Sequence, residues 1–280
     1  MRRRQGGKVS KSVSISIATN SIIMCTKLFA FVTTGSPTLF AETVHSATDV
    51  INQVLLKVGE VKAQAKSTEK HPFGFGKERY FWALVSSISV LFLGCGASVR
   101  HGIEALLHQE PSEPFAFSTI ALLVFAGCLE AYTFHTAWRE IGGLQGLKAG
   151  RQKTTILAVL LEDAVALLGI ALTLFVAFWS RLVGPAPNMD AGISIGIGIL
   201  LGVMALALAR LNKEILIDVS DISVNAEVAR VVKEQSGIHI EVASSLIDAD
   251  RCILFVHVAP QDIPKEIDYA RLTDVGERLK

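Results

Sequence analysis

Six apolar stretches constrain this chain more than any other feature of its sequence. A bilayer needs about 20 consecutive, mostly apolar residues for one helical span. The stretches that meet this requirement are residues 13–34, 38–58, 80–103, 115–138, 155–182 and 191–211. Hydrophobic residues make up 50% of the 280, and the mean hydropathy is +0.44, which is high for a soluble domain. The sequence therefore predicts an α-helical membrane protein with six transmembrane helices.

The charged residues between these stretches predict the orientation. Lys and Arg gather before the first stretch, between the second and third, and between the fourth and fifth, whereas the remaining loops contain only Arg181. The positive-inside rule then places both termini in the cytoplasm, in a multi-pass protein of a bacterial inner membrane or an organelle membrane. Arg2, Arg3 and Arg4 also allow a transit peptide, but we interpret the first stretch as a retained span.

The composition changes at residue 212, which predicts a transport domain over 1–211 and a second domain over 212–280. Ser223 is a candidate N-cap and Gly237 a stop signal for a helix, and two β-rich runs follow. The predicted elements are a helix at 223–235, strands at 238–242 and 252–258, and a last helix at 264–280. This order predicts a small cytoplasmic α+β domain of ferredoxin-like type, truncated or minimal because a closing strand is absent.

The second stretch carries two ionisable side chains, His45 and Asp49, where apolar residues are expected. Being four residues apart, they share one helical face. Each binds a divalent cation or a proton, and ionisable groups inside a membrane usually mark a pathway. Since a transition-metal site needs three or four ligands, the adjacent Glu162 and Asp163 of the fifth stretch are the next candidates. The predicted metal residues are His45, Asp49, Asp163 and Glu162, with Glu162 either a ligand or a neighbour of one.

Other polar residues within the stretches have simpler interpretations. Asn20, Asn52 and Gln53 are expected to form hydrogen bonds between helices. Residues near the ends of the stretches are expected to extend toward the membrane surface; these are Lys27, Arg100, His101, Glu104 and Asp190. Two acidic residues remain open. Glu42 either lines the approach to the site or pairs with Lys27, and Glu130 is an alternative contact for the ion or proton.

Several functional classes and motifs are disfavoured. The net charge of +1 argues against a nucleic-acid partner, and the absence of a nucleophile–base pair or a cofactor loop argues against an enzyme and predicts no cofactor. The glycine-rich segment 71–80 lacks phosphate-loop spacing and is interpreted as a turn. Glycines four apart in the sixth stretch, Gly192 with Gly196 and Gly198 with Gly202, favour tight packing within one subunit over a dimer contact.

These motifs together resemble the cation diffusion facilitator family along nearly the whole chain. The resemblance is carried by Gly35-Ser36, by His45-Ser46-x-x-Asp49-x-x-Asn52-Gln53, and by the run from His71 to Glu78. Glu162-Asp163, the glycines of the third stretch and Glu130 are similar to the zinc transporter nine-type branch. Most family members have a histidine four residues before the fifth-span aspartate, and this chain has Val159 there.

The resemblance implies a homodimeric exporter that exchanges Zn²⁺ for protons by alternating access. It also implies a transport site formed by the second and fifth spans. Neutral imidazole binds a metal and imidazolium does not, so His45 is the expected coupling group. Two alternatives remain. One is transport of Mn²⁺, Fe²⁺ or Co²⁺, which accept oxygen-rich sites. The other is a membrane-anchored metal sensor or scaffold with little transport, given Val159.

Overall fold

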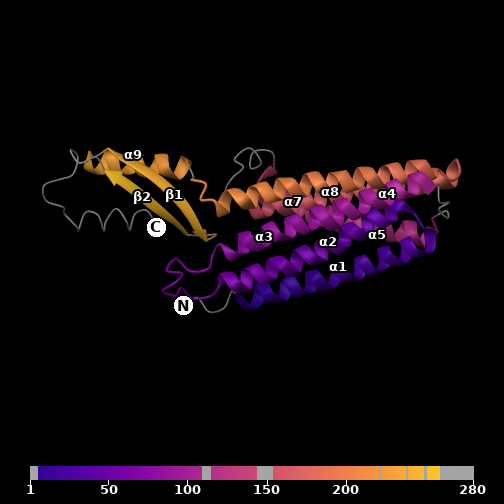
Figure 1. Cartoon of the computed structure of the whole chain (residues 1–280), viewed down its shortest axis with the longest axis horizontal. Helices are drawn as coiled ribbons and strands as arrows, with labels where there is room; N and C mark the ends of the chain where they lie inside the picture. The colour runs from indigo at the N-terminus through magenta and orange to yellow at the C-terminus, as the bar shows by residue number, and fades with distance from the viewer. Residues whose placement is uncertain are drawn as a thin grey trace. The chain divides into compact units, whose positions relative to one another are not determined.

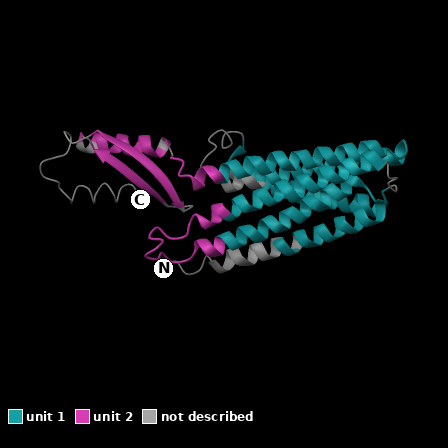
Figure 2. Cartoon of the chain, viewed as in Figure 1, with its two compact units in different colours: residues 1–59, 82–212 teal, residues 60–81, 213–280 magenta. Residues whose placement is uncertain are grey.

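The structure is a computed structural model that describes residues 6–108, 115–143, 154–220, 222–237, 239–248 and 251–258. The chain forms two compact units, one of residues 1–59 and 82–212 and the other of residues 60–81 and 213–280 (Figure 2). Residues 60–81, which the sequence prediction placed in the transport domain, therefore cluster with the C-terminal part of the chain. The two units are described separately below.

The first unit is a bundle of long helices (Figure 1). They are α1 (Gly6–Thr34), α2 (Pro37–Ala63), α3 (Glu78–Ser89), the π-helical segment η1 (Val90–Gly96), α4 (Ala97–His108), α5 (Phe117–Ile141), α7 (Thr154–Leu182) and α8 (Pro187–Leu216). The segments α3, η1 and α4 form one continuous rod. Each predicted apolar stretch is helical over its described residues, except that Phe115 and Ala116 precede the start of α5.

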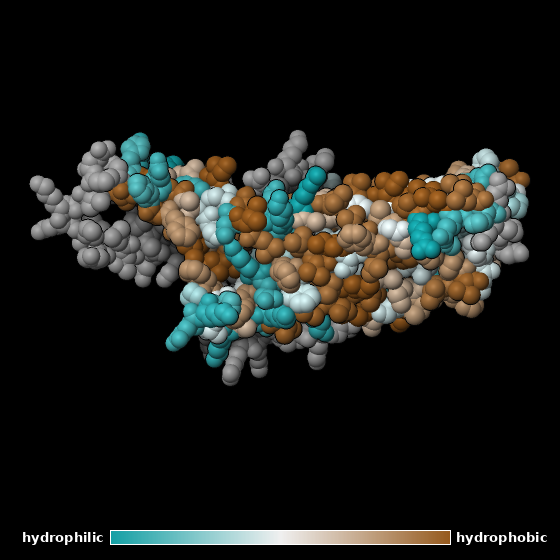
Figure 3. Space-filling view, viewed as in Figure 1, coloured by the Kyte–Doolittle hydropathy of each residue, from teal (hydrophilic) through white to brown (hydrophobic). Residues whose placement is uncertain are grey.

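Four of these rods are long and apolar enough to cross a bilayer: Glu78–His108, Phe117–Arg139, Leu160–Leu182 and Pro187–Leu216. The described part of α1 contributes a shorter apolar segment, Asn20–Thr34. Helix α2 is not among the four, and it carries Glu42, His45 and Asp49 in its first half. Apolar side chains make up much of the visible surface of the bundle (Figure 3), and many large ones are exposed. The protein is an integral membrane protein.

Helix α2 lies between two apolar clusters. Leu39 of α2 packs in a cluster with residues of α1, α5 and α7, and Ala41 packs in a second cluster dominated by α8. Both side chains have no exposed surface. The helix begins after a turn at Gly35, whose φ of +66° is a conformation that side chains with a Cβ rarely adopt. The polar face of α2 is therefore held inside the bundle by apolar contacts on either side of it.

The glycines of α8 explain how closely it approaches η1 and α4. A Cβ at Gly198 would lie 2.9 Å from Cγ2 of Val99, and one at Gly202 would lie 2.9 Å from Sγ of Cys95. The interpretation as packing within one subunit is confirmed for this pair. Gly192 and Gly196 have no atom within 4 Å of a built Cβ among the described residues.

The second unit contains α9 (Ile222–Ser236) and an antiparallel pair of strands, β1 (Ile240–Asp248) and β2 (Arg251–Val258). The predicted helix and both strands are present, although β1 continues beyond the predicted end at 242. Ser223 lies inside α9 and not at its N-cap, whereas Gly237 follows the helix with a φ of +74°. The predicted last helix, 264–280, lies outside the described residues, so the ferredoxin-like assignment stays a prediction.

The segment 60–81 is tied to this sheet by polar contacts. Lys77 donates a hydrogen bond to Asp218, which also accepts one from Ser245 of β1. Arg79 forms an ion pair with Glu60 at 3.2 Å. The predicted turn is confirmed, because Gly74 has a φ of +84° and its N–H donates to the carbonyl of His71 at 3.0 Å.

Candidate metal site

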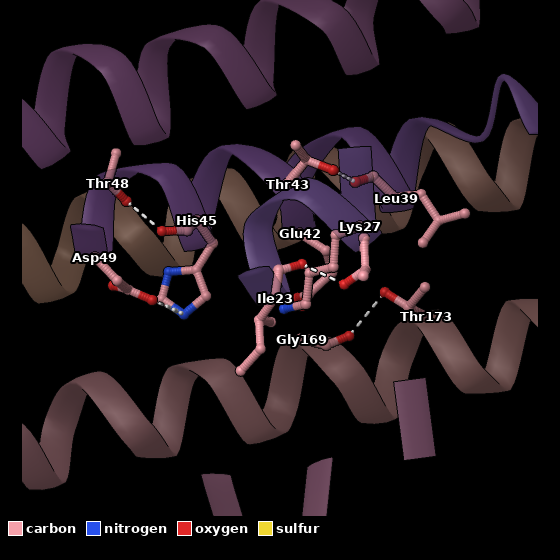
Figure 4. Close-up of polar contacts among 11 residues, drawn as sticks. Ile23, Lys27, Leu39, Glu42, Thr43, His45, Thr48, Asp49, Gly169 and Thr173 are labelled. Carbon is pink, nitrogen blue, oxygen red and sulfur yellow. Dashed lines mark hydrogen bonds and ion pairs between the residues drawn. The ribbon is translucent and has the colours of Figure 1, made fainter. Parts of the chain in front are cut away.

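The centre of the candidate site is the pair His45 and Asp49 on α2. One turn of helix brings Nε2 of His45 to 3.7 Å from Oδ2 of Asp49, and the two side chains point toward one another (Figure 4). His45 is 1% exposed, yet neither of its ring nitrogens has a hydrogen-bond partner among the described residues. Buried polar groups almost always have partners. An imidazole left without one beside a carboxylate is available to bind a cation.

The second pair of predicted residues, Glu162 and Asp163, lies on α7 and differs in its contacts. Oε1 of Glu162 accepts a hydrogen bond of 2.7 Å from the amide of Asn52. Asp163 lies beside Thr133 of α5, and its buried Oδ2 has no hydrogen-bond partner in the described parts of the chain. The two adjacent carboxylates are thus not equivalent, because Glu162 is hydrogen-bonded to α2, whereas Asp163 contacts α5 and keeps one oxygen without a hydrogen-bond partner among the described residues.

Carboxylates from three helices act on one another in this region. The carboxyl groups of Asp49, Asp163, Glu130 and Glu162 lie close enough for their charges, when they are ionised, to influence one another. Like charges held together inside a bundle repel, and a divalent cation would offset that repulsion. Glu130, one of the open alternatives, therefore belongs to the same electrostatic cluster. His135 on the same helix is exposed.

The predicted ligands are not assembled into a closed coordination sphere. Within the described residues, no group of three or more His, Cys, Asp or Glu side chains is placed to hold a metal ion together. His45 and Asp49 are near one another, whereas the carboxylates of α7 approach them only closely enough to interact through their charges. A site closed by these residues would need the carboxylates of α7 nearer to His45 and Asp49 than they lie in this structure.

A buried ion pair lies next to the site, three residues before His45. Nζ of Lys27 on α1 is 2.7 Å from Oε2 of Glu42 on α2, and the two side chains are 1% and 0% exposed (Figure 4). Of the two interpretations of Glu42, pairing with Lys27 is confirmed. The expectation that Lys27 extends to the membrane surface is wrong, because Glu42 provides a buried partner for its charge.

The N-terminal end of α2 is also fixed by a buried charge. Oδ1 of Asp190 on α8 accepts a hydrogen bond of 2.9 Å from the backbone N–H of Thr38. Asp190 is 1% exposed, so the expectation that it extends to the membrane surface is wrong as well. Its carboxylate takes the place of an N-cap side chain on a neighbouring helix, a role that the position near a span end did not indicate.

The match to known proteins identifies the family. Residues 13–217 match the family defined by the cation efflux transmembrane domain. The chain belongs to the cation efflux family. The matched range runs from α1 to the last residues of α8, so it includes every residue of the candidate site.

Among similar proteins, this cation efflux chain is 35% identical over 218 residues to the mitochondrial "Proton-coupled zinc antiporter SLC30A9" of Xenopus laevis. It is 28% identical over 218 residues to "Metal tolerance protein C4" of Arabidopsis thaliana. These matches cover 74% of this chain but 38% and 47% of the two relatives, so the chain spans less than half of their length. "Magnetosome protein MamM" of Paramagnetospirillum magneticum is 28% identical over 138 residues, 48% of this chain and 43% of the relative. The resemblance to the cation diffusion facilitators and to the zinc transporter nine-type branch is confirmed.

Proposed function

We propose that this cation efflux protein exports Zn²⁺ from the cytoplasm in exchange for protons, with His45, Asp49 and Asp163 as ligands and Glu162 beside them. The observation that carries the proposal is the buried His45, whose ring nitrogens have no hydrogen-bond partner in the described parts of the chain and whose Nε2 lies 3.7 Å from Oδ2 of Asp49. The family membership and the similarity to proteins named proton-coupled zinc antiporters support it.

The same groups supply the coupling. Neutral His45 can bind Zn²⁺, whereas a protonated imidazole has no lone pair to offer. Asp49 and Asp163 offset the charge of the bound ion and take up protons when it leaves. Because each group holds either metal or proton, loading by one excludes the other. We further propose six spans, both termini in the cytoplasm and a homodimer, as the sequence predicts.

Zinc flux into proteoliposomes under a pH gradient tests the assignment. We expect His45→Ala and Asp163→Ala each to lower the flux roughly tenfold or more, since even the outer partners of metal ligands contribute about 10- to 100-fold. His135→Ala is the matched control, because His135 is exposed on α5. Wild-type flux in both site variants would refute the assignment, and elemental analysis of the purified protein would identify the metal.

A metal-sensing role with little transport is the second candidate. It is favoured by Val159, which stands where many family members have a metal-binding histidine, and by the open arrangement of the described ligands. Zinc binding that depends on Asp49 in the absence of any flux would support this role. Flux that depends on both Asp49 and the pH gradient would exclude it.

A further inference from the structure

Two consecutive hydrogen bonds, one buried and one partly buried, link three helices next to the candidate site. Ser86 Oγ on α3 donates to Asn52 Oδ1 on α2 at 2.7 Å, and Asn52 Nδ2 donates to Glu162 Oε1 on α7 at 2.7 Å. Ser86 and Asn52 are 2% and 7% exposed. Asn52 is three residues after Asp49 and two helical turns after His45, so all three lie on one face of α2.

The orientation of the Asn52 amide follows from its partners. A carboxylate oxygen only accepts hydrogen bonds, so Glu162 must face the NH₂ group of the amide. The hydroxyl of Ser86 can donate to the amide oxygen left on the other side. A flipped amide would place its oxygen against Oε1 of Glu162, and the two would repel. The contacts on α3 and α7 therefore hold Asn52 in one orientation.

These two hydrogen bonds separate the roles of the two neighbouring carboxylates on α7. Glu162 is turned toward a neutral amide and is held there by a hydrogen bond, whereas Asp163 has a buried oxygen without a partner among the described residues. Consecutive residues on a helix point about 100° apart, so both carboxylates cannot face α2 in the same way. The side chain that is restrained is the longer and more mobile of the two.

We propose that Asn52 is a positioning residue that sets metal specificity by holding Glu162 out of the ligand set; the inference rests on the proposed function. With Glu162 restrained, the site offers one imidazole and two carboxylates, which suits four-coordinate Zn²⁺ with a water molecule. With Glu162 released, a further pair of oxygens becomes available. Ions that prefer more oxygen ligands, of which Mn²⁺ is the example, would then gain relative to Zn²⁺.

The test measures the affinities of the full-length protein for Zn²⁺ and for Mn²⁺, by competition with a metal indicator in detergent. Asn52→Leu keeps the size of the side chain but removes the amide. We expect the ratio of Mn²⁺ to Zn²⁺ affinity to rise roughly 10-fold or more, within the range that partners of metal ligands usually contribute. The shift should disappear in Asn52→Leu/Glu162→Gln, since a neutral amide at 162 is a poor ligand.

Two controls separate positioning from a general structural effect. Gln53→Leu removes the neighbouring amide, whose Oε1 is buried without a hydrogen-bond partner in the described chain, and should leave the ratio unchanged. If Asn52→Leu does not fold, Ser86→Ala replaces it, because it removes one of the two contacts that hold Asn52 in place and should shift the ratio in the same direction.

Two results would overturn the inference. One is an unchanged affinity ratio in a folded Asn52→Leu or Ser86→Ala variant. The other is a shift that persists when Glu162 is also replaced. Failure of the unaltered protein to bind Zn²⁺ or Mn²⁺ would instead refute the proposed function, and the inference with it. These outcomes are distinguishable because the unaltered protein is measured first.

Discussion

At the scale of single residues, Gly169 shows how little space surrounds the buried charges. A Cβ at this position of α7 would clash with Oε1 of Glu42. A side chain here would therefore displace the carboxylate of Glu42. Gly169 thus allows α7 to approach the ion pair of α1 and α2, six residues after Asp163.

We expect Gly169→Ala to lower the melting temperature in detergent, because overpacking of this kind typically costs about 1–3 kcal/mol. Gly196→Ala is the control: no described atom lies within 4 Å of its Cβ, and alanine is the better helix former by roughly 0.5–1 kcal/mol. A melting temperature for Gly169→Ala that equals that of the unaltered protein would show that Glu42 has room to move.

Sequence alone predicted which residues are polar inside the bundle, but of their contacts between helices it named only the pairing of Glu42 with Lys27, as one of two interpretations. His45 and Asp49 were identifiable because their spacing within one helix determines that they share a face. The partners of Lys27, Asp190 and Glu162 lie on other helices, and they depend on how each helix is rotated about its axis. No local pattern specifies that rotation, so Lys27 and Asp190 were assigned to the membrane surface, and the link from Asn52 to Glu162 was not found.

At the scale of elements, hydrophobic length predicted the helices of the bundle well. Several helices end beyond the predicted apolar stretch because polar residues continue them. Helix α2, for example, continues to Ala63. Hydrophobic length says nothing about the polar contacts between α1 and α2. These contacts include the Lys27–Glu42 ion pair, in which both side chains are buried.

We expect Lys27→Met to destabilise the protein by about 3–5 kcal/mol, because it leaves the carboxylate of Glu42 buried without its partner. The double variant Lys27→Met/Glu42→Gln removes both charges and should recover much of that loss. A thermal shift assay on the two variants measures the difference. Equal losses in the single and the double variant would mean that the pair contributes through packing alone.

In the second unit, the hydrogen bond from Lys77, followed by that from Ser245, lowers the pKa of Asp218 below its ordinary value of 3.8. A carboxyl with a depressed pKa stabilises the folded form while it is ionised, and this contribution is lost as the pH falls through the lowered value. We expect hydrogen exchange in residues 60–81 to rise as the pH falls below 3.8 and through the lowered pKa of Asp218. In Asp218→Asn the exchange should be faster already at neutral pH and less sensitive to acid.

At the scale of the whole molecule, the family match and the apolar helices describe a membrane protein, and its orientation is a prediction from loop charges. Cys252 provides a reporter, because it is exposed on β2 in the second unit. A membrane-impermeant maleimide should label Cys252 in inside-out vesicles and not in right-side-out ones, with Cys252→Ser as the control for the other cysteines. Labelling from the opposite side would show that the predicted topology is inverted and that the proposed direction of transport is wrong.

The hydrogen bond between Asp190 and Thr38 has an electrostatic consequence for the proposed metal site. The N-terminus of a helix carries a partial positive charge of about half an elementary charge from its aligned peptide dipoles, which repels cations. The first residues of α2 would present that charge two turns from His45. The carboxylate of Asp190 offsets it, and Glu42 offsets the ammonium of Lys27. If a divalent cation binds at His45, as we propose, it faces a nearly neutral neighbourhood at this end of α2, and the dipole of this helix does not oppose its binding.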